Sequence, residues 1–263
     1  SEMCIRDSYV PGHQLLAGKS VLITAAAGAG IGYSAARRSA EEGCRALMIS
    51  DIHPRRLDEA VERLKAETGL AAIYGQLCNV TLEEDVQALV EVAEQRLGGV
   101  DVLINNAGLG GQKAVVEMSD EEWSRVLDVT LTGTFRMTRA MLPHMQRRGA
   151  GAIVNNASVL GWRAQKEQAH YAAAKAGVMA LTRCAALEAA EHGVRINAVA
   201  PSIALHDFLK KASSEELLAS LAGREAFGRA AQVWEVANVM MFLASDYASY
   251  MVGEVLSVSS QQA

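Results

Sequence analysis

Cysteines, prolines and aromatic residues are scarce in this sequence, and long uncharged apolar runs are absent. Its four cysteines lie far apart with no CxxC spacing, so neither a zinc site nor a disulfide framework is expected, and the thiols are expected to stay reduced. No apolar run is long enough to span a membrane. No basic stretch precedes an apolar one near the N-terminus, so no secretory signal is expected. These absences predict a cytoplasmic protein without a bound metal.

Charge of a single sign is missing too. The net charge of −5 comes from 25 basic and 30 acidic residues, which are scattered along the chain. Nucleic-acid binding usually needs a clustered basic face, so we expect neither a nucleic-acid nor a membrane partner. What the chain has in quantity is apolar residues. They make up 50% of its 263 positions, enough for one large core.

From Ser20 onward, short apolar runs alternate with longer amphipathic stretches. We expect strands at residues 20–24, 45–50, 71–77, 101–104, 152–155, 194–199 and 253–258. Helices are expected at residues 31–43, 54–68, 82–97, 120–148 and 169–192. Continuous apolar strands separated by helices indicate a parallel sheet that is covered on both faces. Right-handed crossovers then give a Rossmann-type, doubly wound α/β fold with three layers.

The chain shows no repeat, no low-complexity linker and no break in composition, so a single domain over residues 18–263 is expected. Residues 1–17 are interpreted as an N-terminal extension. Its first eight residues fit no element, and a tag or a sequencing artefact is one explanation for them. The least regular stretch lies at about residues 202–231, and we expect it to be a functional lid rather than a domain boundary.

A turn rich in glycine and alanine, residues 24–32, follows the first strand and opens a helix. Glycines let the backbone approach a pyrophosphate, and the helix N-terminus favours its negative charge, although such a turn can also be a plain connection. Asp51 follows the second strand, where a carboxylate binds an adenosine ribose hydroxyl. The alternative is a cap on the next helix. Because a carboxylate there repels a 2′-phosphate, NAD is favoured, while Arg55 and Arg56 keep NADP open.

Two amide-bearing segments end the next strands. Asn79 follows the third strand, where its amide can bind an adenine edge or simply form a turn. Residues 105–108, Asn-Asn-Ala-Gly, end the fourth strand with small side chains that can pack beside a ribose or simply finish the strand.

Tyr171 and Lys175 form an i, i+4 pair and therefore share one face of a helix. A lysine ammonium beside a phenol is expected to lower the tyrosine pKa, so that the phenol can exchange a proton with an alcohol or carbonyl oxygen. The pair alone is common and mostly structural. Ser158 adds weight, because it follows the fifth strand at the edge where ligands bind in doubly wound folds. Its hydroxyl can hold the substrate oxygen, or it can cap the following helix.

Together with residues 196–201, Ile-Asn-Ala-Val-Ala-Pro, these motifs resemble the short-chain dehydrogenase/reductase family in order and spacing, over nearly all of residues 18–258. The resemblance implies an enzyme that interconverts a secondary alcohol and a ketone with NAD or NADP, usually as a homotetramer. It implies proton transfer by Tyr171, substrate orientation by Ser158 and ribose binding by Lys175. The cofactor contacts that it implies are Thr24, Gly28, Gly30, Ile31, Gly32, Asp51, Asn79, Val80, Asn106, Ala107, Gly108, Tyr171, Lys175, Pro201 and Ile203.

The sequence departs from the family pattern at three places. Ala25 or Ala26 stands where the family has its first glycine after Thr24, and the turn is one residue longer. Thr130 stands where the family has an asparagine that helps to hold a proton-relay water, so we keep Thr130 as a catalytic candidate. Pro201-Ser202 replaces the usual Pro-Gly after the sixth strand.

The substrate is less well defined. Residues 155–164 and 201–204 are similar to an actinobacterial group that acts in steroid breakdown, on a bicyclic fragment of rings C and D carried as a coenzyme A thioester. Arg163 and Lys166 can then meet the thioester phosphates, or be ordinary surface charges. Several aromatic residues and one histidine follow Ser158 or lie in the stretch after Pro201. They either line an apolar substrate site or pack the lid and subunit contacts. These residues are Trp162, His206, Phe208, Phe227 and Trp234. The rivals are a 3-oxoacyl thioester reductase and a non-catalytic dinucleotide-binding protein.

Overall fold

One parallel sheet of seven strands organises the computed structural model, which describes residues 9–205 and 215–260. The strand order is β3-β2-β1-β4-β5-β6-β9. Their bounds are β1 Ser20–Ile23, β2 Ala46–Asp51, β3 Ile73–Leu77, β4 Val102–Asn105, β5 Gly151–Asn156, β6 Val194–Pro201 and β9 Val255–Val258. The reversal of order beside β1 is that of a doubly wound sheet, and it places a ligand crevice at the carboxyl ends of β1 and β4.

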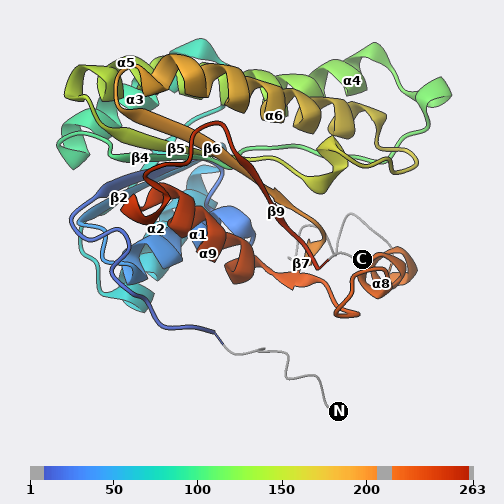
Figure 1. Ribbon diagram of the computed structural model, residues 1–263, viewed down its shortest axis with the longest axis horizontal. Helices are drawn as coiled ribbons and strands as arrows, with labels where there is room; N and C mark the ends of the chain where they lie inside the picture. The colour runs from blue at the N-terminus through green and yellow to red at the C-terminus, as the bar shows by residue number, and fades with distance from the viewer. Residues whose placement is uncertain (1–8, 206–214, 261–263) are drawn as a thin grey trace.

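Helices cover both faces of this sheet (Figure 1). The first face carries α1 Ile31–Glu41, α2 Pro54–Thr68 and α9 Val233–Ala244. The second face carries α3 Glu83–Leu97, α4 Asp120–Leu127, α5 Gly133–Arg148 and α6 Ala169–Ala190. The four residues of β1 and of β4 are all buried, because both of their faces lie under helices. The predicted Rossmann-type, three-layer single-domain fold is therefore confirmed.

The helices differ from the expectation in two places. The long helix expected at residues 120–148 is interrupted by a π-helical turn, Asp128–Thr132, between α4 and α5. Such turns are rare and are found mostly at functional sites. Helix α9 was not expected at all, since its residues are apolar almost all round and lack the amphipathic period. It packs beside α1 and completes the first face.

The stretch expected to be an irregular lid has regular parts. Strand β7, Ala204–Leu205, pairs in parallel with β8, Ala231–Gln232, and α8 spans Glu215–Gly223. His206 and Phe208 lie outside the described residues. Because β7 pairs with β8, Ala204 and Ala231 lie side by side beyond the carboxyl end of β6.

The N-terminal stretch after residue 8 is bound to the domain. Arg38 on α1 donates to the carbonyls of Val10 at 2.6 Å and Pro11 at 3.1 Å. Glu42, whose side chain is 1% exposed, pairs with Arg38 at 2.8 Å and accepts the backbone N–H of His13 at 2.7 Å. This buried ion pair fixes the stretch to the end of α1.

None of the helices within the described ranges is both long and apolar enough to cross a bilayer.

We expect Glu42→Leu to lower the free energy of unfolding by about 3 kcal/mol, because it removes the buried carboxylate 2.8 Å from the Arg38 guanidinium and leaves only the Glu41 carboxylate at 3.5 Å. Urea unfolding measures the loss. Glu59→Leu is the control, since the Glu59 side chain is 64% exposed, pairs with exposed Arg55 at 3.7 Å, and should cost less than about 1 kcal/mol. Equal losses in the two variants would contradict a structural role for the buried pair.

Candidate active site

Polar residues gather where strands β1, β4 and β5 end. Thr24 directly follows β1, and its hydroxyl accepts the backbone N–H groups of Asn106 at 3.0 Å and Ala107 at 3.1 Å. Asn105 and Asn155 are register partners on β4 and β5, and their amides are joined at 2.9 Å. Buried amide–amide hydrogen bonds of this kind join neighbouring strands, although the Asn105 side-chain oxygen itself has no partner among the described residues. The carboxyl edge of the sheet is therefore a rigid base for the loops above it.

Three of the four predicted catalytic residues, Ser158, Tyr171 and Lys175, converge on this edge. Lys175 is 3% exposed, and its ammonium donates to the carbonyl of Asn156 at 2.5 Å. The Lys175 nitrogen also lies 5.5 Å from the centre of the Tyr171 ring. The Ser158 hydroxyl interacts with the phenol of Tyr171 and lowers its pKa. Ser158 also accepts the N–H of Leu160 at 3.2 Å, so the capping role considered for it is real as well.

The expected pKa of Tyr171 is wrong in direction for the free chain. Burial raises the pKa of the Tyr171 phenol above its usual 10, and the Ser158 contact offsets this only in part. Burial also lowers the pKa of Lys175 to about 8. Desolvation penalises the charged form of each group and so shifts both pKa values towards the neutral forms.

Thr130 lies within the π-helical turn and is fully buried. Its hydroxyl accepts the N–H of Leu109 at 2.9 Å and donates to the carbonyl of the same residue at 3.1 Å. Its own carbonyl accepts the hydroxyl of Thr134 at 2.8 Å. The side chain is thus committed to the loop after β4. Thr130 therefore holds this loop in place.

The turn after β1 is shaped for close backbone approach. A Cβ on Gly32 would lie 2.4 Å from the Asn106 amide nitrogen and 2.6 Å from the Ala25 carbonyl oxygen, whereas a Cβ on Gly28 would meet only one atom, at 4.0 Å. Helix α1 begins after Gly30 without a side-chain cap, so its first N–H groups can serve a ligand. Ala25, in place of the family glycine, has φ +52. That backbone conformation favours glycine, so the departure keeps the turn's shape at the cost of some strain.

Asp51 ends β2 and faces this turn. Its carboxylate accepts the N–H of Ala27 at 3.3 Å and the N–H of His53 at 3.2 Å. The cap of α2 is His53, which makes no side-chain capping bond, so Asp51 does not cap that helix directly. The turn, the open helix end and the adjacent carboxylate fit a pyrophosphate that is linked to a ribose.

A cavity of about 490 Å³ opens beside Asn79. It is lined by Ile52, Asn79, Thr81, Ser124, Arg125, Asp128 and Val129. The Asn79 side-chain oxygen accepts the N–H of Thr81 at 3.1 Å, so the turn role is present. Val80 is buried and packs where Gly133 leaves room, and its carbonyl accepts the Arg136 guanidinium at 3.4 Å. The cavity adjoins Asp51 through Ile52, and its size suits a flat heterocycle.

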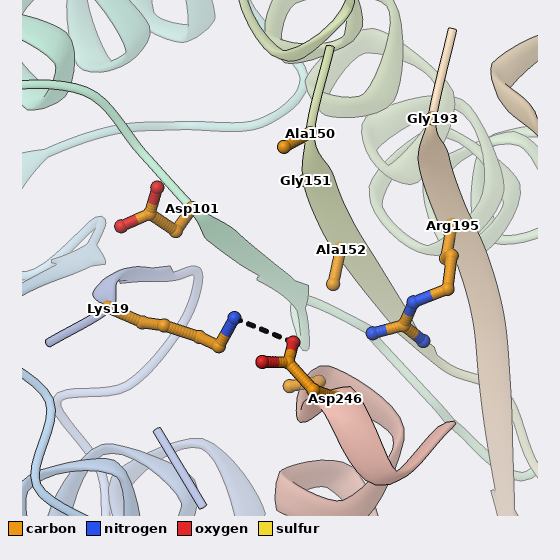
Figure 2. Close-up of a pocket in the computed structure, with 9 residues that line it drawn as sticks. Lys19, Asp101, Ala150, Gly151, Ala152, Gly193, Arg195 and Asp246 are labelled. Atoms are coloured by element: carbon orange, nitrogen blue, oxygen red, sulfur yellow. Dashed lines mark hydrogen bonds and ion pairs between the residues drawn. The ribbon is translucent and has the colours of Figure 1, made fainter. Parts of the chain in front are cut away.

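A second cavity, of about 170 Å³, lies at the opposite edge, where the strands begin (Figure 2). There Lys19 pairs with Asp246 at 2.9 Å, and Arg195 donates to the carbonyl of Leu243 at 2.8 Å. Arg195 also caps the end of α9 through Ser245 and Ala248. Its donors thus serve the protein itself, and none of the expected site residues lies at this cavity.

The remaining predicted residues lie at the end of β6, at the base of the lid, on the loop after Ser158 and on α9. Pro201 ends β6 and is buried, while the Ile203 carbonyl accepts the N–H of Ala231 at 2.8 Å at the base of the lid. Arg163 and Lys166 are exposed on the loop after Ser158. Trp234 packs edge-on against Tyr9 at 5.4 Å, which supports a packing role for that aromatic residue.

Three residues of the site were missed in the sequence. Asn156 accepts the Lys175 ammonium through its carbonyl, and its amide donates to the Asn106 oxygen at 3.0 Å. Gln168 donates to the Gly111 carbonyl at 2.7 Å, and buried His170 lies against the same loop. A polar residue in an otherwise apolar strand was the available signal for Asn156. For Gln168 and His170, the signal was their place just before Tyr171.

Lys175 should leave a signature in stability against pH. The unfolded chain holds the lysine proton up to its ordinary pKa of 10.5, whereas the folded chain releases it near 8. Between these values the unfolded state binds more protons, so this group's contribution to stability rises with pH. We expect the wild type to gain roughly 1–3 kcal/mol over Lys175→Met across that window. Urea unfolding at several pH values measures the difference. A flat difference, as expected for exposed Lys65→Met, would contradict the burial of an ionisable ammonium.

Several known proteins are similar over most of their length. A (5R,7aS)-5-hydroxy-7a-methyl-1-oxo-2,3,5,6,7,7a-hexahydro-1H-indene-carboxyl-CoA reductase of Mycobacterium tuberculosis is 60% identical over 98% of both chains. A cis-4-hydroxycyclohexanecarboxylate dehydrogenase of Sinomonas cyclohexanicum is 40% identical over 90% of this chain and 94% of that one. A 3-oxoacyl-[acyl-carrier-protein] reductase of Thermotoga maritima is 37% identical over 92% of this chain and 97% of that one.

Solved structures agree with these relatives. The crystal structure of a short chain dehydrogenase from Mycobacterium smegmatis matches with a TM-score of 0.86 at 56% identity, over 97% of this chain and 98% of that one. An actinorhodin polyketide ketoreductase, solved with NADPH, matches with a TM-score of 0.86 at 33% identity, over 95% of this chain and 98% of that one. The family model described as Enoyl-(Acyl carrier protein) reductase matches residues 25–260. The chain belongs to the short-chain dehydrogenase/reductase family and is an oxidoreductase that uses a nicotinamide dinucleotide.

Proposed function

We propose that this enzyme interconverts a ring hydroxyl and a ketone on a bicyclic carboxyl-coenzyme A thioester derived from a steroid, with NAD as the cofactor. The observation that carries the proposal is the convergence of Ser158, Tyr171 and Lys175 on one edge of the sheet, in a chain 60% identical to a reductase named for such a thioester. The hexahydroindene of that name has two fused rings, as do rings C and D of a steroid.

The chemistry follows from the positions of these side chains. The nicotinamide ring, when bound, accepts a hydride from the alcohol carbon or returns it to the ketone carbon. The Ser158 hydroxyl holds the substrate oxygen next to Tyr171. In oxidation the Tyr171 oxygen removes the hydroxyl proton, and in reduction its phenol returns a proton to the oxygen. Lys175 brings a positive charge towards the phenolate that forms, while Asn156 keeps the ammonium in place.

The cyclic nature of the substrate is supported by a second relative. The Sinomonas cyclohexanicum enzyme, at 40% identity, is named for a hydroxyl on a six-membered ring that bears a carboxylate. The two ring-hydroxyl enzymes thus share more identity with this chain than the Thermotoga maritima enzyme, at 37%, which is named for 3-oxoacyl groups on a carrier protein. Trp162 is 51% exposed near Ser158 and offers an apolar surface for a ring.

NAD is favoured by the charges around Asp51. Its carboxylate faces the turn that fits the pyrophosphate, while Arg55 pairs with Glu59 at 3.7 Å on the exposed face of α2. A 2′-phosphate at the adenosine ribose would therefore meet the Asp51 carboxylate, which repels it. The same carboxylate can accept the hydroxyls of an unmodified ribose.

Tyr171→Phe should lower turnover of the bicyclic thioester by about 10²–10⁴, since it removes the proton-transfer group and leaves the ring. The assay follows NADH formation with the ring-hydroxy thioester and NAD, beside a linear 3-oxoacyl thioester with NADPH. Tyr247→Phe is the control, because Tyr247 is 80% exposed at the opposite edge of the sheet. Faster turnover of the linear thioester would make the chain a 3-oxoacyl reductase. Full activity in Tyr171→Phe would refute the mechanism.

Asp51→Ala should reduce the preference for NADH over NADPH by roughly 10–100-fold, because it removes both a ribose acceptor and a charge that repels the 2′-phosphate. Dissociation constants for both nucleotides are measured by fluorescence titration. Asp58→Ala removes the same charge from an exposed site on α2 and should leave the ratio unchanged. A wild type that binds NADPH more tightly, or an unchanged ratio in Asp51→Ala, would contradict this assignment.

A further inference from the structure

Asn156 occupies the last position of β5, between the cofactor turn and the catalytic lysine. Its carbonyl accepts the Lys175 ammonium at 2.5 Å, and its amide nitrogen donates to the Asn106 oxygen at 3.0 Å. Its amide oxygen is buried, yet no group among the described residues donates to it. This atom is therefore a buried acceptor that the described protein leaves unused.

The hydrogen-bond network shows that the atom without a partner is the side-chain oxygen of Asn156 and not its side-chain nitrogen. The Asn106 amide nitrogen donates to the carbonyls of Thr24 at 3.2 Å and Ala25 at 3.0 Å, which can only accept. The other Asn106 atom facing Asn156 must therefore be its oxygen. Asn156 must present its nitrogen to that oxygen, so the atom left over is the Asn156 oxygen. Whatever satisfies it has to be a hydrogen-bond donor.

The surroundings narrow the choice of donor. Asn106 borders the turn that fits the pyrophosphate, and Lys175 lies on the other side of Asn156. A pyrophosphate has no donor to offer. The part of a dinucleotide beyond the pyrophosphate, towards Lys175, begins with a ribose whose hydroxyls are donors.

We propose that the Asn156 side-chain oxygen accepts a hydrogen bond from a hydroxyl of the nicotinamide ribose, which makes Asn156 a cofactor-binding residue. The inference depends on the proposed use of a nicotinamide dinucleotide. Through its carbonyl, the same residue fixes Lys175, so one strand end positions both the ribose and the ammonium. A buried acceptor without a protein partner is explained when its partner is the ligand.

Binding of three nucleotides distinguishes a contact between Asn156 and the ribose from a purely structural role of Asn156. NADH contains the nicotinamide ribose, ADP-ribose contains the ribose without the nicotinamide, and ADP lacks both. Asn156→Leu keeps the size of the side chain but removes the acceptor. Dissociation constants are measured by calorimetry without substrate, together with the melting temperature of each variant without ligand.

We expect Asn156→Leu to weaken NADH and ADP-ribose binding by about tenfold, the loss typical of one hydrogen bond, and to leave ADP binding unchanged. Asn156→Thr keeps a shorter acceptor on a strand-compatible side chain, and it should lose less. Asn238→Leu is the matched control, because Asn238 on α9 also has a buried side-chain oxygen with no partner among the described residues. It should change none of the three constants.

Unchanged ADP-ribose binding in Asn156→Leu would overturn the proposal. An equal loss of ADP binding would also overturn it, because the effect would then come from a displaced Asn106 and turn. A wild type that binds ADP-ribose and neither NADH nor NADPH would refute the proposed function instead. The failures of the two proposals are thus distinguishable.

Discussion

The contact between the Lys175 ammonium and the last carbonyl of β5 is the constraint on which the site depends. Taking an ammonium out of water is costly, and a single strong acceptor at 2.5 Å compensates for part of that cost. Helix α6, which carries Lys175, must therefore approach β5 in one register. Because Tyr171 is one turn away on the same helix, that register also sets where the phenol stands relative to Ser158.

This arrangement explains the opposite pKa shifts of the two residues. Both side chains are removed from water, and desolvation favours the neutral phenol and the neutral amine alike. An i, i+4 spacing indicates the attraction between an ammonium and a phenol, but it carries no information about the burial of either side chain. A bound dinucleotide and substrate would add charges and donors that the free chain lacks, and the phenol would titrate in that environment.

Much of the fold was predictable because its signals are local. Seven apolar runs separated by amphipathic stretches specify a parallel sheet, and β1, β2 and β4 begin within a residue of the expected positions. Helix α9 was not predicted, because a helix that is apolar almost all round has no amphipathic period in its sequence. The π-helical turn at Thr130 was not predicted for another reason. It is stabilised by contacts with Leu109, which lies on a different segment. Tertiary contacts of this kind have no pattern in the sequence.

The candidate site, like the fold, was predictable only in part. Ser158, Tyr171 and Asp51 could be named from their places after strands and on a helix face, whereas a polar residue at the end of a strand does not by itself single out Asn156. Its importance comes from three neighbours on different segments: Asn106, Lys175 and, as we infer, the ligand. Two of the three departures from the family pattern are compensated by the local structure. Ala25 keeps the left-handed backbone of the missing glycine, and Thr130 holds the loop after β4 with its hydroxyl. What these substitutions preserve is the placement of the backbone around the crevice, which is the property that hydride and proton transfer require.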